Sequence, residues 1–183
     1  MHAVQLVQRL HQHRQWVNAK LLDAAQKLSV EQLHQRFEIG QGSVWKTLTH
    51  LYAAEYVWLQ ALNGNENPVA PGDRPGKLPG NQEADDAAAS LSELKARWAS
   101  LDTEWNTYLA DLTDDSLTQL SAKVSSLSGQ RSTTARGDIL LHLCTHAQYT
   151  VAQAVNMMRH AGLDRLPDPM FITMAREESA AGG

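Results

Sequence analysis

The chain has 183 residues, of which 43% are hydrophobic and 20% charged, and its formal net charge is −4 at pH 7. This length suits one domain, residues 1–183, whose core needs no disulfide or metal to hold it together. The acidic balance argues against nucleic-acid binding and against attachment to anionic membranes, because both need a basic face. The N-terminal residues lack a signal-peptide pattern and no stretch is apolar enough to span a membrane, so we expect a cytoplasmic protein.

The first half of the chain carries two long stretches in which apolar residues recur at steps of three and four, the spacing of a helix. The first runs from about 3 to 28. Ser29 then begins the sequence S-V-E-Q, which resembles a capping box and predicts a short helical turn to about residue 37. The second stretch covers about 43–62, and Ser43 is a suitable N-cap for it.

The second half carries two more. The stretch at about 84–112 has a heptad-like seam of leucines and aromatic residues, as expected of a helix that packs at a shallow angle in a bundle. Its members are Leu91, Leu94, Trp98, Leu101, Trp105, Tyr108 and Leu112. The last stretch covers about 136–161, and Gly162 is placed to end it. The pattern therefore predicts an all-α fold, a four-helix bundle.

The segments between these helices differ in composition. Residues 63–82 hold four prolines and four glycines and cannot form a helix or a central strand. We expect a long surface connection there between the second and third long helices, either a mobile link or a functional lid. The polar segment before the last helix favours a small hairpin around Gly129. The C-terminal tail is expected to pack Met170 and Phe171 and then to fray from about residue 173.

Three of the eight histidines form a candidate site. His142 and His146 are four residues apart on the last helix and so share one of its faces. His50 lies midway along the second long helix, and we expect all three to face the core. Such a trio offers imidazole ligands for a divalent metal, with coordination positions left for water or substrate. The alternative is a set of core histidines that hydrogen-bond polar neighbours and bind no metal. The other histidines are expected to be solvated, namely His2, His11, His13, His34 and His160.

Three blocks of this sequence resemble the DinB family, the DinB/YfiT-like bundles that often carry a metal. Residues 16–22 (WVNAKLL) are similar to the family's opening W-x-N-x-x-L-L segment. Residues 42–51 (GSVWKTLTHL) resemble its G-S-I-x-x-T-L-x-H-I block. Residues 139–149 (ILLHLCTHAQY) resemble the L-L-H-h-h-N-H-x-x-Y block of its last helix. The resemblance covers nearly the whole chain and implies the same four-helix bundle.

The resemblance also implies a metal site with a gap. The family's three histidines correspond to His50, His146 and position 150, where this chain has Thr150. A neutral hydroxyl is a poor ligand for zinc, nickel or iron compared with imidazole. His142 lies one turn before His146 and could stand in if the ion shifted along the helix by about 5 Å. We therefore expect a degenerate site for a divalent metal, either zinc, nickel or iron.

Two hypotheses for function remain open. By resemblance, the chain is a metal-dependent transferase, isomerase or hydrolase, some relatives of which use low-molecular-weight thiols. Alternatively, it is a non-catalytic bundle that has lost its metal and binds a small molecule or a protein partner. Glu55 is expected to be solvated or structural, and the single cysteine, Cys144, a buried structural thiol. The resemblance also makes a homodimer an expectation.

Overall fold

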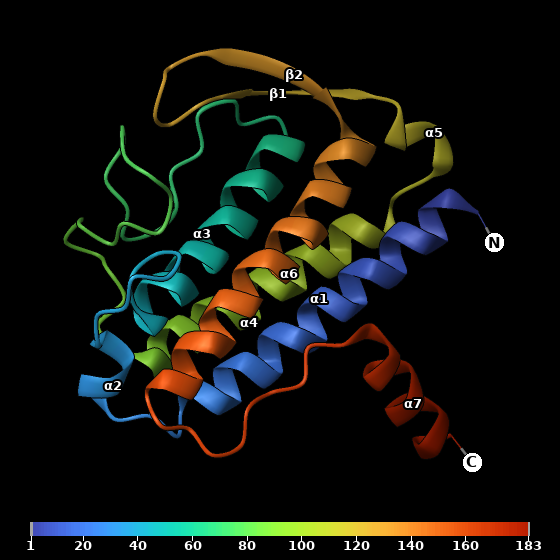
Figure 1. Cartoon of the computed structure of the whole chain (residues 1–183). Coiled ribbons are helices and arrows are strands. Elements are labelled where there is room, and N and C mark those ends of the chain that lie inside the picture. Colours follow the sequence, from blue (N-terminus) through green and yellow to red (C-terminus); the bar gives the residue numbers. More distant parts are fainter. Residues whose placement is uncertain (1, 183) are drawn as a thin grey trace.

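The computed structural model describes residues 2–182, which form helices and one small hairpin (Figure 1). The helices, in chain order, are α1 (Ala3–Ala25), α2 (Val30–His34), α3 (Val44–Leu62), α4 (Leu91–Ala110), α5 (Asp114–Leu117), α6 (Arg136–His160) and α7 (Phe171–Ala181). The strands are β1 (Leu120–Val124) and β2 (Arg131–Ala135). The four long helices, α1, α3, α4 and α6, make the bundle, which confirms the predicted four-helix architecture.

Side-chain caps fix where several helices begin. Ser43 accepts a hydrogen bond from the backbone N–H of Lys46, and Ser90 accepts one from Glu93. Each serine thereby satisfies an N–H that has no partner within the helix. The apolar pattern predicted that this helix begins near residue 84. The Ser90 cap explains why α4 begins at Leu91 instead. Ser29 caps α2 in a complete capping box, as expected from S-V-E-Q.

The core lies between the four long helices. Its largest fully buried side chains include Trp98 and Trp105 of α4, which come from the predicted heptad seam. α1 and α6 run in one direction and α3 and α4 in the other, so the chain must return along the bundle between α3 and α4 (Figure 1). The Pro/Gly-rich connection makes this return along the outside of α3. None of the helices within residues 2–182 is long and apolar enough to cross a membrane.

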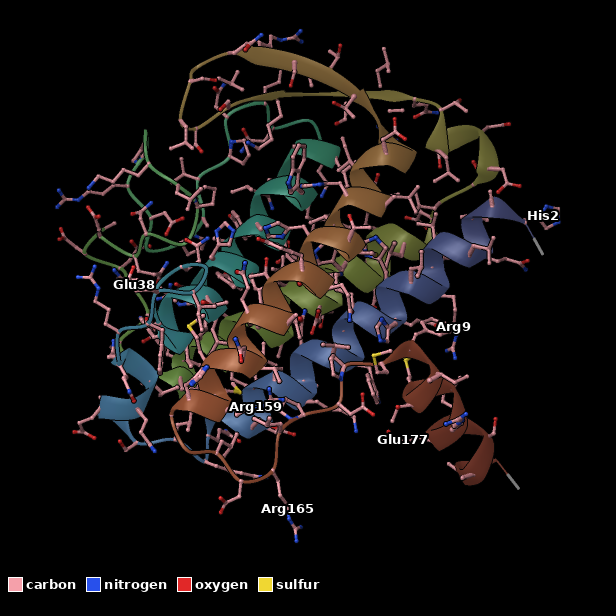
Figure 2. The ribbon with its side chains drawn as sticks, in the orientation of Figure 1. His2, Arg9, Glu38, Arg159, Arg165 and Glu177 are labelled. Atoms are coloured by element: carbon pink, nitrogen blue, oxygen red, sulfur yellow. The ribbon has the colours of Figure 1, made fainter. Side chains whose placement is uncertain are left out.

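The predicted hairpin is present, but the predicted fraying of the tail is wrong. β1 and β2 pair antiparallel, and Gly129 has a positive φ of 68° in the turn between them. The tail instead forms α7, whose Met174 is only 2% exposed. Charged side chains hold α7 against α1: Arg9 pairs with Glu178, and Lys20 pairs with Glu177. Figure 2 labels Arg9 and Glu177 on these two helices.

Candidate metal centre and its pocket

The bundle brings two of the three candidate histidines together. His50 extends from α3 and His146 from α6, and their Nε2 atoms lie 3.2 Å apart. The two rings meet edge-on, with centroids 5.1 Å apart and planes inclined at 70°. Because α3 and α6 are antiparallel neighbours, residues 96 positions apart in the sequence meet at this point.

The orientation of His50 is fixed from its other side. Its Nδ1 lies 2.8 Å from the carbonyl oxygen of Pro79, which can only accept a hydrogen bond. Nδ1 therefore carries the proton, and Nε2, the atom that faces His146, keeps its lone pair. Histidines that bind metals commonly have this arrangement, with one ring nitrogen donating to a carbonyl and the other free for the metal.

Pro79 lies in the connection between α3 and α4, and hydrogen bonds of the neighbouring residues hold this part of the connection against α3. The backbone carbonyl of Gly80 accepts a hydrogen bond of 3.0 Å from the Thr49 hydroxyl. The Gly80 N–H donates to the buried carboxylate of Asp73 at 2.6 Å, and the same carboxylate accepts two bonds from Gln82. Sequence reasoning missed these residues; the repeated Pro-Gly pairs around Asp73 were the only signal of tight turns.

The third candidate, His142, lies beside the pair and not within it. Its ring centroid is 5.7 Å from that of His146, and the ring of Trp58 meets it edge-on at 5.7 Å. The His142 side chain is exposed, and His50 and His146 are half-buried, so the expectation that all three face the core is wrong. Thr150, at the position that the resemblance implies for a third ligand, is buried at 2% exposure.

The three histidines line one pocket of about 290 Å³ between α3, α6, the hairpin and the α3–α4 connection. This volume lies near the lower end of the range for small-molecule sites. Burial, and then the neighbouring His50 and His142, lower the pKa of His146 to about 4. His146 is therefore neutral at neutral pH, which is the form that can act as a ligand.

The sequence profile of the DinB superfamily matches residues 13–154, the greater part of the chain. The chain belongs to the DinB superfamily. No curated protein sequence matches it significantly.

Solved structures share the DinB fold of this chain. A DinB-like protein from Bacillus cereus ATCC 10987 is 17% identical, with a TM-score of 0.61 over 87% of this chain and 94% of the other. YfiT from Bacillus subtilis is 20% identical, with a TM-score of 0.64 over 86% of this chain and 89% of its own. YfiT is described as "a probable metal-dependent hydrolase with an unusual four-helix bundle topology". The TM-scores show a common fold. At such low sequence identity they do not establish the activity of this DinB protein.

The two facing histidines of this DinB chain fit a metal ion, but a complete ligand set is not formed. Two nitrogens that bind one tetrahedral zinc at about 2.0–2.1 Å lie roughly 3.3 Å apart, and the observed Nε2–Nε2 distance is 3.2 Å. Across residues 2–182, however, no group of three or more His, Cys, Asp or Glu side chains is placed to hold a metal. The pair alone would give an ion two protein ligands, and His142 is the further imidazole that lines the pocket.

Two histidines outside the pocket, His11 and His13 of α1, are buried. The expectation that they are solvated is therefore wrong. His11 is fully buried and its Nε2–H donates to the carbonyl of Leu140 at 3.1 Å. His13 is 9% exposed and contacts the carbonyl of Pro169 at 2.9 Å. The ring of Trp105 in α4 lies against His11, and the ring of Phe171 in α7 lies against His13. The pattern of α1 alone does not reveal these neighbours.

Glu55 is structural, one of the two roles expected for it, and takes no part in the histidine pocket. It is 1% exposed and forms an ion pair with the equally buried Arg14 of α1. The amide of Asn18 and the indole N–H of Trp98 donate to its two oxygens at 2.7 and 3.1 Å. Cys144 also has no sign of reactivity: burial raises the pKa of its thiol to about 11, so the thiol stays protonated.

Proposed function

We propose that this DinB protein is a divalent-metal-dependent hydrolase of small molecules, with His50 and His146 as its principal metal ligands. The observation that carries the proposal is the 3.2 Å approach of two Nε2 atoms, one of which keeps its lone pair because Pro79 fixes the tautomer. The fold shared with YfiT, described as a probable metal-dependent hydrolase, supports this choice of reaction class over a transferase. A bound metal would supply Lewis acidity and a water of lowered pKa.

The residues of the chain have distinct roles in this proposal. His50 is the oriented ligand, because its Nδ1–H is already committed to Pro79. His146 would complete the pair after moving its proton to Nδ1, and His142 is available as a third imidazole from the exposed side of the pocket. Trp58 and Leu78 give the pocket apolar walls that limit how much water reaches the pair.

The second candidate is a bundle that binds a small molecule without metal chemistry. It is favoured by Thr150, which is buried and offers no imidazole, and by the lack of a three-residue metal group within residues 2–182. Under this hypothesis, the Nε2 atoms of His50 and His146 share a hydrogen bond, and the pocket recognises its ligand through that pair.

Elemental analysis of tag-free protein decides between the two. We expect close to one equivalent of zinc, nickel or iron after equilibration, and loss of that metal in His50→Ala and His146→Ala. His160→Ala is the matched control, because His160 is exposed at the end of α6, away from the pocket. The metal-loaded protein should hydrolyse activated esters such as p-nitrophenyl butyrate, and the two alanine variants should not. A wild-type protein that takes up no metal overturns the proposal.

A further inference from the structure

The hairpin forms one wall of the histidine pocket, and this wall differs in chemical character from the helices that carry the histidines. Lys123 of β1 and Ser132 of β2 line the pocket and lie directly opposite each other in the strand register. Ser125, Ser126 and Leu127 of the turn also contribute to the lining. The hairpin therefore adds one cation and three hydroxyls to the pocket, whose histidines come from α3 and α6.

The hairpin is fixed, so this cation has a defined position. The Ser121 hydroxyl donates to the carbonyl of Ala61 at the end of α3, at 2.7 Å. The Val124 N–H donates to the carbonyl of Glu66 at 2.8 Å. The Glu66 carboxylate accepts two hydrogen bonds of 2.7 Å from Arg131, one from Nε and one from Nη2. Both strands are thus tied to the end of α3 and the segment that follows it.

Lys123 has a positive charge that no side chain balances. Across residues 2–182 no carboxylate lies within ion-pair distance of its Nζ, and the residues lining the pocket include no Asp or Glu. Its Nζ makes one hydrogen bond, to the carbonyl of Val124 at 3.3 Å, and lies 5.2 Å from the ring centroid of Trp58. An ammonium has three donors, so at least one is left for a ligand. Burial lowers the pKa of Lys123, as expected for a cation without a partner.

We propose that this pocket binds a small organic anion, with its carboxylate or phosphate on Lys123 and the hairpin hydroxyls and its reactive end at His50 and His146. The inference rests on the proposed function for the role of the histidine end, whereas the anion site on Lys123 exists with or without a metal. The pocket volume of about 290 Å³ limits the ligand to the size of a metabolite. Trp58 forms an apolar wall that contacts both His142 and the Lys123 ammonium, so the body of the ligand would lie along it.

The binding test uses metal-free protein, so that it is independent of the proposed hydrolase. Calorimetry with glutarate, inorganic phosphate and the neutral isostere glutaramide should show binding of at least one anion and none of the amide. Lys123→Met keeps the aliphatic stem over Trp58 and removes the charge, and it should weaken anion binding about tenfold or more. Lys95→Met is the matched control, because Lys95 is a surface lysine of α4 paired with Asp23. The preference between glutarate and phosphate identifies the anionic group.

The same variants then test the role of the anion in turnover. With metal-loaded protein, kcat/KM should favour the glutarate monoester of p-nitrophenol over the neutral butyrate ester, and Lys123→Met should reduce this preference about tenfold without changing the metal content. Equal anion binding by the wild type and Lys123→Met, or equal binding of glutaramide, overturns the proposal. If only the hydrolase proposal is wrong, the results differ: the protein takes up no metal and hydrolyses no ester, but it still binds anions in a way that depends on Lys123.

Discussion

Gly80 lies so close to His50 that a Cβ atom at position 80 would be 2.4 Å from the His50 Cα and 2.5 Å from its backbone nitrogen. This contact brings the Pro79 carbonyl to the His50 ring, so the shape of the histidine site depends on a glycine 30 residues away. Gly80 also has a positive φ of 88°, which disfavours any side chain there. The α3–α4 connection is therefore part of the site.

Gly80→Ala should destabilise the fold and weaken metal binding. The added methyl group meets backbone atoms, which cannot move aside as a flexible side chain can, so we expect a loss of about 2–4 kcal/mol in the free energy of unfolding. Gly76→Ala is the matched control: Gly76 has a similar φ of 77° in the same connection, but nothing lies within 4 Å of its added Cβ. Denaturant unfolding and zinc titration measure both effects, and equal losses in the two variants would show that the contact with His50 is unimportant.

Asp73→Ala should release the connection from α3. The Asp73 carboxylate accepts hydrogen bonds from Gly80 and Gln82, and the variant leaves the buried Gly80 N–H and the part-buried Gln82 N–H without this acceptor. We expect a loss of about 2 kcal/mol and, because the Pro79 carbonyl is no longer held on His50, weaker metal binding. Asp85→Ala, an exposed position in the same connection, should change neither quantity. Hydrogen exchange of the Gly80 amide is a direct measurement, and unchanged protection in Asp73→Ala would contradict the prediction.

The buried pair of Arg14 and Glu55 predicts an energetic coupling. Replacing Glu55 alone with Met leaves the Arg14 charge without a partner in the core, which costs about 3–5 kcal/mol. The double variant Arg14→Met/Glu55→Met removes that charge as well and should be more stable than Glu55→Met alone. Thermal unfolding of the wild type, both single variants and the double variant measures the coupling energy. If the stability losses of the two single variants add up to that of the double variant, the two residues are not coupled. Asp23→Ala, which breaks the exposed pair with Lys95, should cost less than about 1 kcal/mol.

His11 predicts a loss of stability in mild acid. Burial, and then the charge of Arg14, lower its pKa from 6.5 to about 3 in the folded protein. Below pH 6.5 the unfolded chain therefore takes up a proton that the folded protein does not, so unfolding becomes easier as the pH falls. Between pH 7.5 and 5 the wild type should lose about 2 kcal/mol more than His11→Phe, which has no proton to bind. Urea unfolding at both pH values measures the difference, and His160→Gln should behave as the wild type does.

Thr150→His should strengthen metal binding. Position 150 lies one turn after His146 on the same face of α6, so an imidazole there restores the family's third histidine. Because Thr150 is buried, we also expect a cost of about 1–3 kcal/mol in stability from overpacking. Zinc titration should show at least a tenfold gain over the wild type. Thr145→His is the control, since Thr145 is exposed on another part of the helix, and a similar gain there would show that any added histidine suffices.

The sequence predicted which histidines belong to the candidate site, but it did not predict the other residues that surround them. The G-S-V-W-K-T-L-T-H-L block and the paired histidines of the last helix indicated His50 and His146, and the structure brings their rings together. Neither block indicated Pro79, whose carbonyl fixes the His50 tautomer, or Lys123, which reaches the pocket from the hairpin. Pro79 and Lys123 reach the site through contacts between segments about 30 to 70 residues apart. The local sequence pattern of each segment does not indicate such contacts.

By itself, the sequence determined the local structure: the four long helices, the Ser43 cap, the capping box at Ser29 and the hairpin around Gly129. Each of these depends on hydrogen bonds and side-chain spacing within a few residues, so a short window of sequence specifies it. Only the tertiary structure decided which polar residues are buried. It placed Arg14 and His11 in the core and the candidate histidines at a surface pocket, because burial is set by the neighbouring helices and not by the helix that carries the residue.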